Sequence, residues 1–466
     1  MAIHIKLCLY GEMEDKVNSN VPSRVVSTSS VKQTKERVSL TEETDDQITF
    51  QSIAAIKDAS LVEKKKLFMI KIQQCCSLFD FNDPSREVAG KEMKRNTLQE
   101  LIEYVKEGQA VFTEAVYIEV VNMVARNCFR TLPPSQYQIY DPDEDEPVLE
   151  PTWLHLELVY EFFMEVLSSP EFKTSTARKH MGEAFLLQLL PLLDSEDVRE
   201  RLSVKNVVHK LYSVFTCFRY YLRTQLQNIL LEYLYETEKF RGISEILEIF
   251  ASIIQGYVLP LKEEHKTYLI RILMPLHKAN GLPFYHSQLV YCIVLFIEKD
   301  SSLGTEVIMS LLRYWPKTCT RKEVLFLTEL EEILSGLCIL QFKDVMEPVF
   351  NRIASCLMSQ HFQVSEKSLL FAYNSHIMGM VNKNASIIFP ILLPCMLEMR
   401  KEHWNKHLQP IIDKVVKDFS KMNSRRYSEI LKLFKLKDGE NNHKEVKEKT
   451  KGKAKARIMR RFSFSK

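Results

Sequence analysis

Hydrophobic residues recur every three or four positions along most of the chain, from about residue 60 to residue 436. This spacing is that of an α-helix with one apolar face. Thr113 is placed to act as the N-cap of such a helix. The apolar face of 113–128 comprises Val116, Val120, Val124 and Cys128. The apolar face of 153–167 comprises Leu156, Val159, Phe163 and Val166. Alternation with a period of two is scarce, so we predict an all-α protein.

The predicted helices are about 12 to 20 residues long and are joined by short connections, which fits one bundle, two bundles or a solenoid of helix pairs. A similar turn opens a helix three times, in Asp83–Val88, Asp194–Val198 and His361–Val364. These turns are separated by close to whole multiples of roughly 40 residues, the repeat length of HEAT and armadillo proteins. We therefore predict a HEAT-like solenoid of about eight helix pairs in residues 56–436.

The two ends of the chain depart from the helical pattern. Residues 1–55 show no sustained hydrophobic period, and residues 437–466 are strongly basic, with ten Lys or Arg and two Glu from Lys444 onward. Segments of this composition bury too little apolar surface to fold, so we predict that both are disordered. The basic tail is a solubilising segment, a nuclear-import signal or a contact for an acidic surface. We expect the protein in the cytoplasm, with this tail as its candidate signal for the nucleus.

An acidic, proline-rich segment interrupts the helices at 131–153. It contains five prolines and an acidic cluster, and it is too long to serve as a simple connection. We interpret it either as a solvated loop or as an arm that binds a basic surface or a metal, although it lacks the Gly and the distal Glu of an EF-hand calcium loop. Its acidic residues are Asp141, Asp143, Glu144, Asp145 and Glu146.

Composition excludes several classes of function. The 63 Lys and Arg are nearly balanced by 60 Asp and Glu, so overall charge does not indicate a nucleic-acid binder. No two of the 12 glycines are close enough to form a phosphate-binding loop or a nucleophile elbow. The longest apolar runs, 289–297 and 387–397, are shorter than a membrane span. The ten cysteines form no Cys-x-x-Cys pair, and we interpret them as reduced core residues, Cys338 included.

No combination of residues indicates catalysis, so we expect a protein that is not an enzyme and needs no cofactor or metal. The sequence Glu329–Glu332 is acidic enough to be considered as an acid–base pair. We interpret it instead as the face of a helix.

The most informative stretch begins at residue 194. A single helix over 197–236 would be unusually long, so we predict a break near Thr216, with Thr216 as the cap and Arg219 in the first turn of the next helix. Before the break, His209 and Tyr212 share a helix face, and Lys210 adds a cation.

The residues one repeat later complete a candidate binding patch. Ile249 and Ile253 follow at the repeat distance of roughly 40 residues, so they are expected beside His209. Lys262 and His265 open the next helix after Pro260. A cationic patch beside an apolar pair suits a short peptide that is both acidic and apolar. The alternative is that the two isoleucines belong to the core.

Short sequences spread over most of the chain resemble one known family, the B-prime regulatory subunits of protein phosphatase 2A. The strings that carry the resemblance are Phe129–Pro134, Asp143–Pro147, Leu158–Phe163, Tyr235–Glu238, Leu259–Lys266, Tyr314–Thr318, Glu329–Leu334, His361–Val364 and His403–Lys406. The resemblance implies a HEAT-like solenoid without activity of its own. Such a subunit docks on the scaffold and catalytic subunits and selects substrates.

The resemblance also implies a peptide site. The family binds Leu-x-x-Ile-x-Glu segments in a concave groove, which maps here to His209, Lys210, Tyr212, Arg219, Ile249, Ile253, Lys262 and His265. In that assignment the isoleucines are exposed and hold the peptide's apolar residues. The cations near Arg219 compensate the peptide's Glu, and Lys262 and His265 meet acidic flanks. The acidic loop, with Asp143, Glu144, Asp145 and Glu146, would lie near the catalytic subunit.

Two departures from the family pattern accompany the resemblance. Lys210 stands where the family usually has Arg, and Ala372–His376 replaces a different string. The alternative to a substrate-selecting subunit is a helical-repeat adaptor that has lost phosphatase binding.

Overall fold

The computed structural model describes residues 53–436 apart from 84, 109, 134–147 and 403. These residues contain 19 α-helices and no strand, which confirms the all-α prediction. The segments predicted to be disordered, 1–55 and 437–466, lie outside the described residues except for 53–55. The acidic cluster at 141–146 lies outside them as well.

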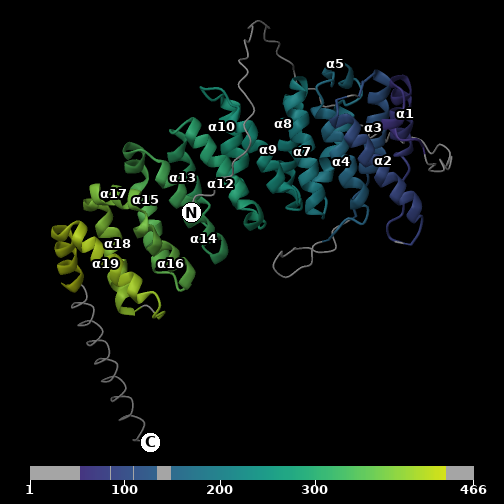
Figure 1. The fold of residues 1–466 in the computed structure, drawn as a ribbon. Coiled ribbons are helices and arrows are strands. Elements are labelled where there is room, and N and C mark those ends of the chain that lie inside the picture. Colours follow the sequence, from purple (N-terminus) through teal and green to yellow (C-terminus); the bar gives the residue numbers. More distant parts are fainter. Residues whose placement is uncertain (1–52, 84, 109, 134–147, 403, 437–466) are drawn as a thin grey trace, which may run out of the picture. The chain divides into compact units, whose positions relative to one another are not determined.

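Each helix pair stacks on the next pair in chain order (Figure 1). The first helices of the pairs therefore form one layer and the second helices form the other. The second helices of the eight pairs in this part of the chain pack in the order α2 (Val88–Lys106), α4 (Trp153–Ser168), α7 (Val198–Val214), α9 (Ile243–Gln255), α12 (Leu282–Lys299), α14 (Thr320–Gly336), α16 (Phe362–Leu370) and α19 (Gln409–Met422). This confirms the predicted solenoid.

The first helices of the pairs are less regular. They are α1 (Leu61–Gln74), α3 (Glu114–Cys128), α5 (Thr174–Ala177), α6 (Glu183–Leu189), α8 (Arg219–Glu232), α10 (Glu263–Tyr268), α11 (Met274–Leu276), α13 (Leu303–Arg313), α15 (Ile339–Leu357), α17 (Ser375–Lys383) and α18 (Ala385–Glu402). A π-helical turn at Leu269–Leu273 joins α10 to α11. No single described helix is long and apolar enough to cross a membrane, although α17 and α18, bent by 114° at their break, pass that test as a pair.

The repeat turns recognised in the sequence fall at equivalent places. Val88 and Val198 are the first residues of α2 and α7, and His361 immediately precedes α16. All three turns therefore open second helices. The 166 residues from Val198 to Val364 span four helix pairs, which fits a repeat of roughly 40 residues. The 110 residues from Val88 to Val198 span two pairs and not the three that this repeat length predicted, because the acidic segment at 131–153 lengthens one of them.

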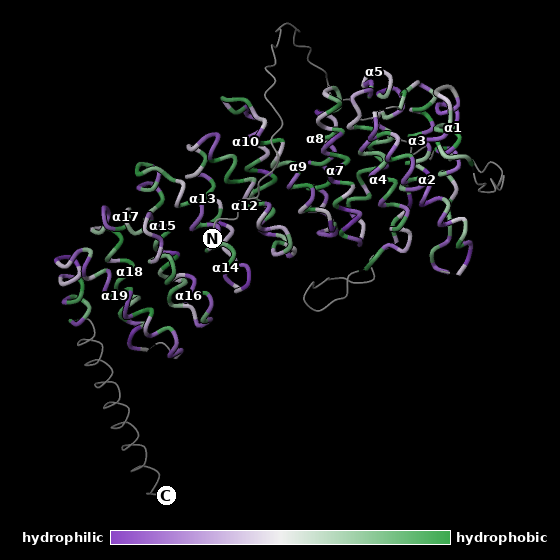
Figure 2. Tube along the Cα trace, viewed as in Figure 1, coloured by the Kyte–Doolittle hydropathy of each residue, from purple (hydrophilic) through white to green (hydrophobic). Residues whose placement is uncertain are grey.

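One hydrophobic cluster runs through the stacked pairs. The apolar faces predicted for α3 and α4 are buried at every position named above. Thr113 is the N-cap of α3, although its side chain makes no capping hydrogen bond. In Figure 2 hydrophobic and hydrophilic positions alternate along the helices, as expected when each pair buries one face against its neighbours.

Two interpretations of polar residues are wrong. Cys338 is exposed at the N-terminus of α15, and Cys217 and Cys319 are exposed as well, although Cys128 and Cys292 are buried as expected. Glu329 is fully buried rather than part of a solvated helix face, and it accepts hydrogen bonds at 3.0 Å from His277 and 3.1 Å from His286. The sequence pattern did not reveal this because both histidines come from elsewhere in the chain.

The buried Glu329 cluster makes stability depend on pH. Burial alone would lower the pKa of His277, but the Glu329 carboxylate outweighs this and raises it above 6.5. Burial would raise the pKa of Glu329, but His277 and His286 lower it to about 2. The ion pair with His277 therefore stabilises the fold fully below the unfolded histidine pKa of 6.5. Its contribution is lost as pH rises through the higher folded pKa, and lost at the acid end as pH falls towards 2.

We expect Glu329→Gln to lower the free energy of unfolding by about 1 to 3 kcal/mol at pH 6, because an amide replaces a charged acceptor. The loss should be smaller at pH 9 than at pH 6, because the contribution of the ion pair falls as pH rises through the raised folded pKa of His277. Urea unfolding of the two proteins at both pH values measures this. An equal loss at pH 6 and pH 9 would contradict a pH-dependent contribution of the His277–Glu329 pair.

Candidate functional site

The second helices α7 and α9 lie side by side, as predicted, and polar pairs join their surfaces. Arg201 bonds to Glu245 at 3.0 Å, and Lys205 bonds to Glu248 at 2.7 Å. One turn later, His209 Nε2 lies 2.7 Å from Ser252 Oγ. The residue beside His209 is thus Ser252 and not Ile249.

This register explains why the two isoleucines are buried. Ile249 and Ile253 keep only 1% and 5% of their surface exposed, so the expectation that both are exposed is wrong. Successive residues of an α-helix point about 100° apart, and a shift of one position turns a side chain from the surface row into the core. Glu248 and Ser252 occupy the row that faces α7, and the isoleucines lie under it.

The predicted helix break positions Arg219. A short 3₁₀ turn, Thr216–Phe218, separates α7 from α8, and Arg219 is the first residue of α8. The break is confirmed, but Thr216 does not cap α8, whose N-cap is Phe218. Arg219 turns back to α7, where its Nε donates to the Tyr212 carbonyl at 3.1 Å. Its guanidinium also lies over the Tyr212 ring, 5.5 Å from the centroid.

A second arginine, not anticipated from the sequence, joins this site. Arg223 follows Arg219 by one helical turn and donates to the Tyr212 hydroxyl at 3.0 Å. Its charge also opposes the rise that burial causes in the pKa of Tyr257. Tyr257 in turn stacks on His265, with ring centroids 3.7 Å apart and planes at 3°. The four-residue spacing from Arg219 could have indicated Arg223 from the sequence alone. Tyr257 lies in a connection without periodicity, so no pattern indicated it.

The positive charge beside Tyr212 resides on Lys210, Arg219 and Arg223 rather than on the histidines of the site. Burial lowers the pKa of His209, and the neighbouring lysines add to this effect. Burial also lowers the pKa of His265, which Glu264 only partly offsets. Both imidazoles are therefore neutral at pH 7. Within the described ranges, no carboxylate forms an ion pair with Lys210, Arg219 or Arg223.

The arrangement is suited to a carboxylate ligand. Two guanidiniums are held by Tyr212, and both retain N–H groups that form no bond to another described residue. His265 Nδ1 is buried without a hydrogen-bond partner in the described structure, and Lys262 is exposed nearby. No described group of three or more His, Cys, Asp or Glu side chains is placed to hold a metal ion.

The acidic residues Asp143, Glu144, Asp145 and Glu146 lie outside the described residues, but both ends of their loop are anchored. Arg130 donates to both oxygens of the buried Glu200 at 2.7 Å and to Glu150 at 2.8 Å. The Glu150 N–H donates to Asp197 at 2.9 Å. Residues on both sides of the loop are thereby joined to the start of α7.

Comparison with known proteins gives this site its context. The family model described as "Protein phosphatase 2A regulatory B subunit (B56 family)" matches residues 53–460. The chain belongs to this family. The resemblance drawn from the sequence is therefore confirmed, and this B56 member is a regulatory subunit rather than an enzyme. As such it associates with the phosphatase 2A holoenzyme.

Individual relatives agree with this assignment. The mouse 56 kDa regulatory subunit alpha isoform is 44% identical over 400 residues, covering 86% of this chain and 82% of the relative. The human delta isoform is 47% identical over 389 residues, covering 83% and 65%. The Caenorhabditis elegans regulatory subunit pptr-1 is 44% identical over 383 residues, covering 82% and 71%.

Proposed function

We propose that this B56 member recruits substrates to the phosphatase by binding Leu-x-x-Ile-x-Glu segments at the junction of α7 and α9. In this proposal it docks on the scaffold and catalytic subunits, and the acidic loop faces the catalytic subunit. The observation that carries the peptide proposal is the pair of guanidiniums on Tyr212, neither of which is ion-paired with a described carboxylate.

The chemistry of the peptide matches this site. Its Glu would bond to Arg219 and Arg223, because planar guanidiniums hold carboxylates through paired hydrogen bonds. Its two apolar residues would contact the half-buried rings of Tyr212 and Tyr257, together with the small exposed edge of Ile253. Acidic residues that flank the motif would meet Lys262.

Two measurements test the proposal. Calorimetry with a Leu-x-x-Ile-x-Glu peptide should show one site per chain, and a peptide with Gln in place of the Glu should bind more weakly. Purification of the tagged chain from cells should bring down the scaffold and catalytic subunits. Failure of the second measurement alone would favour an adaptor that has lost phosphatase binding.

Lys210 is expected to limit the affinity for the peptide. An ammonium is a point charge on a flexible stem, whereas a guanidinium makes two parallel bonds to a carboxylate. We expect Lys210→Arg to strengthen binding by about 0.5 to 1.5 kcal/mol, the scale of one hydrogen bond. A double-mutant cycle against the Glu→Gln peptide should show coupling, and absence of coupling would mean that Lys210 points to solvent.

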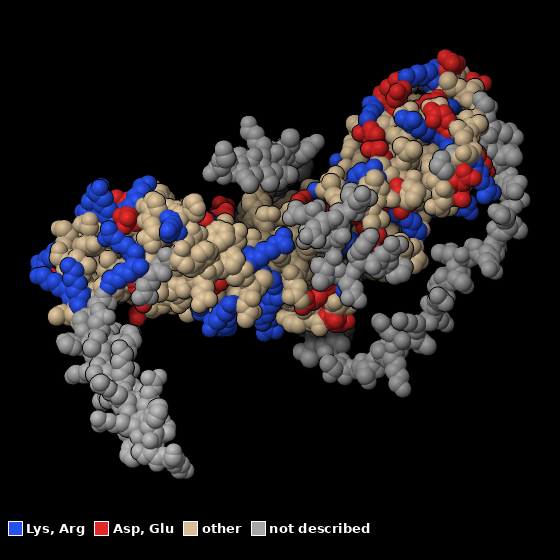
Figure 3. Space-filling view, turned by 90° about the horizontal axis from the view of Figure 1, so that it is seen from below, with Lys and Arg blue, Asp and Glu red and all other residues tan. Residues whose placement is uncertain are grey.

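We also propose that the protein is cytoplasmic and that the basic tail directs a fraction of it to the nucleus. Figure 3 shows Lys and Arg gathered at the end of the solenoid that precedes the tail. The exposed cations there are Lys414, Lys417, Lys421, Arg425, Arg426, Lys432 and Lys435. A fluorescent fusion without residues 444–466 should leave the nucleus and melt at the same temperature as the full chain. An unchanged distribution would contradict this role of the tail.

A further inference from the structure

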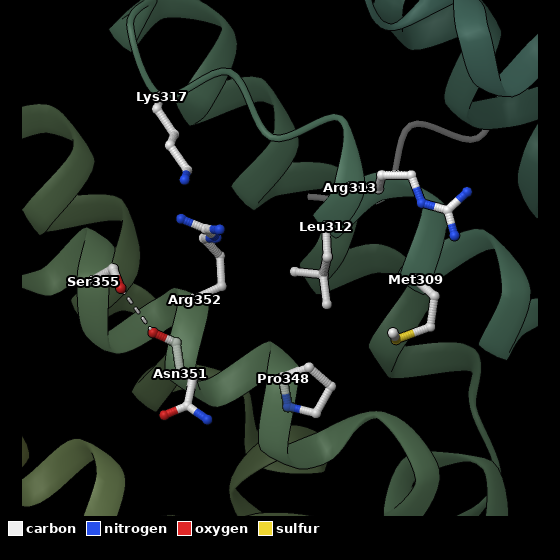
Figure 4. Close-up of a pocket in the computed structure, with 8 residues that line it drawn as sticks. All are labelled: Met309, Leu312, Arg313, Lys317, Pro348, Asn351, Arg352 and Ser355. Carbon is white, nitrogen blue, oxygen red and sulfur yellow. Dashed lines mark hydrogen bonds between the residues drawn. The ribbon is translucent and has the colours of Figure 1, made fainter.

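A second cationic site lies away from the α7–α9 junction. A groove of about 530 Å³ separates α13 from α15, the first helices of two neighbouring pairs. Its apolar surface is formed by Met309, Leu312 and Pro348 (Figure 4). Pro348 lies inside α15 and has no N–H to bond to the preceding turn. A proline ring there presents a flat apolar surface to the groove.

Arg352 is held in this groove by an aromatic ring. Its guanidinium lies over Trp315, 5.5 Å from the ring centroid. Trp315 is fixed in turn, because its Nε1 donates to Glu323 at 2.7 Å. Cys356 also donates to this Glu323 oxygen, so the carboxylate is engaged by two other groups. The guanidinium therefore has a defined plane before any ligand arrives.

Arg352 also has an unused donor. Its Nε is buried and has no hydrogen-bond partner in the described structure. A buried N–H that is left unbonded destabilises the protein, and an arriving acceptor would remove that penalty. The residue is thus arranged to accept an anionic ligand.

Two further cations line the groove. Figure 4 shows the Lys317 ammonium directed towards the Arg352 guanidinium, with Arg313 on the other side of Leu312. Nowhere in the described part of the chain does a carboxylate form an ion pair with any of the three cations. Bringing like charges together without a counterion is unfavourable. The positive charge of the empty groove is therefore uncompensated.

We propose that this groove binds a phosphorylated serine or threonine of a partner protein, with an apolar residue of the same segment on Met309, Leu312 and Pro348. A phosphate monoester carries close to two negative charges and three acceptor oxygens, which match two converging cations better than a single carboxylate does. Nucleic acid fits less well, because the aromatic ring here is buried under Arg352 and offers no surface for base stacking.

The test uses the full chain and the fluorescein-labelled peptide Gly-Leu-pSer-Leu-Gly, followed by fluorescence anisotropy. We expect the phosphopeptide to bind at least about tenfold more tightly than its unmodified serine form, and more tightly than its Glu form. Arg352→Gln should weaken phosphopeptide binding at least about tenfold, and Lys317→Gln at least about threefold. Lys343→Gln is the matched control, since it removes an exposed cation from the same helix outside the groove, and it should bind like the unmodified chain.

Several outcomes would overturn the proposal. Equal binding of the serine or Glu form would exclude a phosphate site, and equal effects of Lys317→Gln and Lys343→Gln would exclude this groove. Displacement of the phosphopeptide by a Leu-x-x-Ile-x-Glu peptide would place it at α7–α9 instead. Loss of phosphatase co-purification by Lys317→Gln without any phosphopeptide binding would make the groove part of the holoenzyme interface. Since Lys317 is exposed, its variant keeps the test valid even if Arg352→Gln fails to fold.

Discussion

Calorimetry should show that Arg219→Glu weakens binding of a Leu-x-x-Ile-x-Glu peptide by about 2 to 4 kcal/mol, which is at least tenfold in affinity. The substitution removes a charge-assisted bond to the peptide's Glu and adds a like charge opposite it. It also removes the donor that ties α8 back to the Tyr212 carbonyl. Arg223 alone would then remain bonded to Tyr212.

Two control variants separate the effect of the charge at position 219 from an effect on folding. Arg219→Gln keeps a neutral donor and should lose less affinity than the charge reversal. Arg321→Glu reverses an exposed cation on α14, a different helix pair, and should bind the peptide normally. Unchanged affinity in a folded Arg219→Glu protein would contradict the assignment of this site.

Thermal melting should show that Ile249→Asp unfolds at least part of the solenoid, with a loss of about 4 kcal/mol or more. The sequence suggested the opposite result. If Ile249 were exposed, an aspartate at this position would stay hydrated and the protein would remain folded. Ile249 is 1% exposed, and an aspartate in its place would be a buried charge without a partner.

Ser252→Asp is the matched control on the same helix. Ser252 faces α7 at the surface and contacts His209, so the new carboxylate would stay hydrated and lie on the same row as the Lys205 partner Glu248. It should melt close to the original protein. A milder change, Ile249→Val, should cost about 0.5 to 1.5 kcal/mol and leave the chain folded for peptide binding. If Ile249→Asp melts normally, the packing described for α9 is incorrect.

The sequence predicted the helices and their stacking because both follow from a period that every pair repeats. Val116 to Cys128 could be placed on one buried face from spacing alone. The contact between α7 and α9 also followed from the repeat length. These predictions needed only the period of the apolar positions and the repeat length, both of which can be read along the chain.

The details of the site needed a precision that repeat length does not provide. A difference of three residues in register placed Ser252 rather than Ile249 beside His209. Tyr257, Arg223 and His265 come from three different segments, so no local pattern predicts that they meet. From the sequence around it, Glu329 was expected at the surface of its helix. Its burial is explained only by the hydrogen bonds to His286 of α12 and to His277 in the turn before α12.

The α7–α9 junction has a mechanical consequence. In a solenoid each pair touches only its neighbours, so the angle between successive pairs is set locally. Here that angle depends on three polar contacts, from the largely buried Arg201 and from Lys205 and His209, and on the buried isoleucines of α9. A peptide that contacts α8, α9 and the end of α7 together would restrict changes in this angle. Occupancy of the site would then make the junction between the first three pairs and the last five more rigid, and would reduce the range of angles between these two parts of the solenoid.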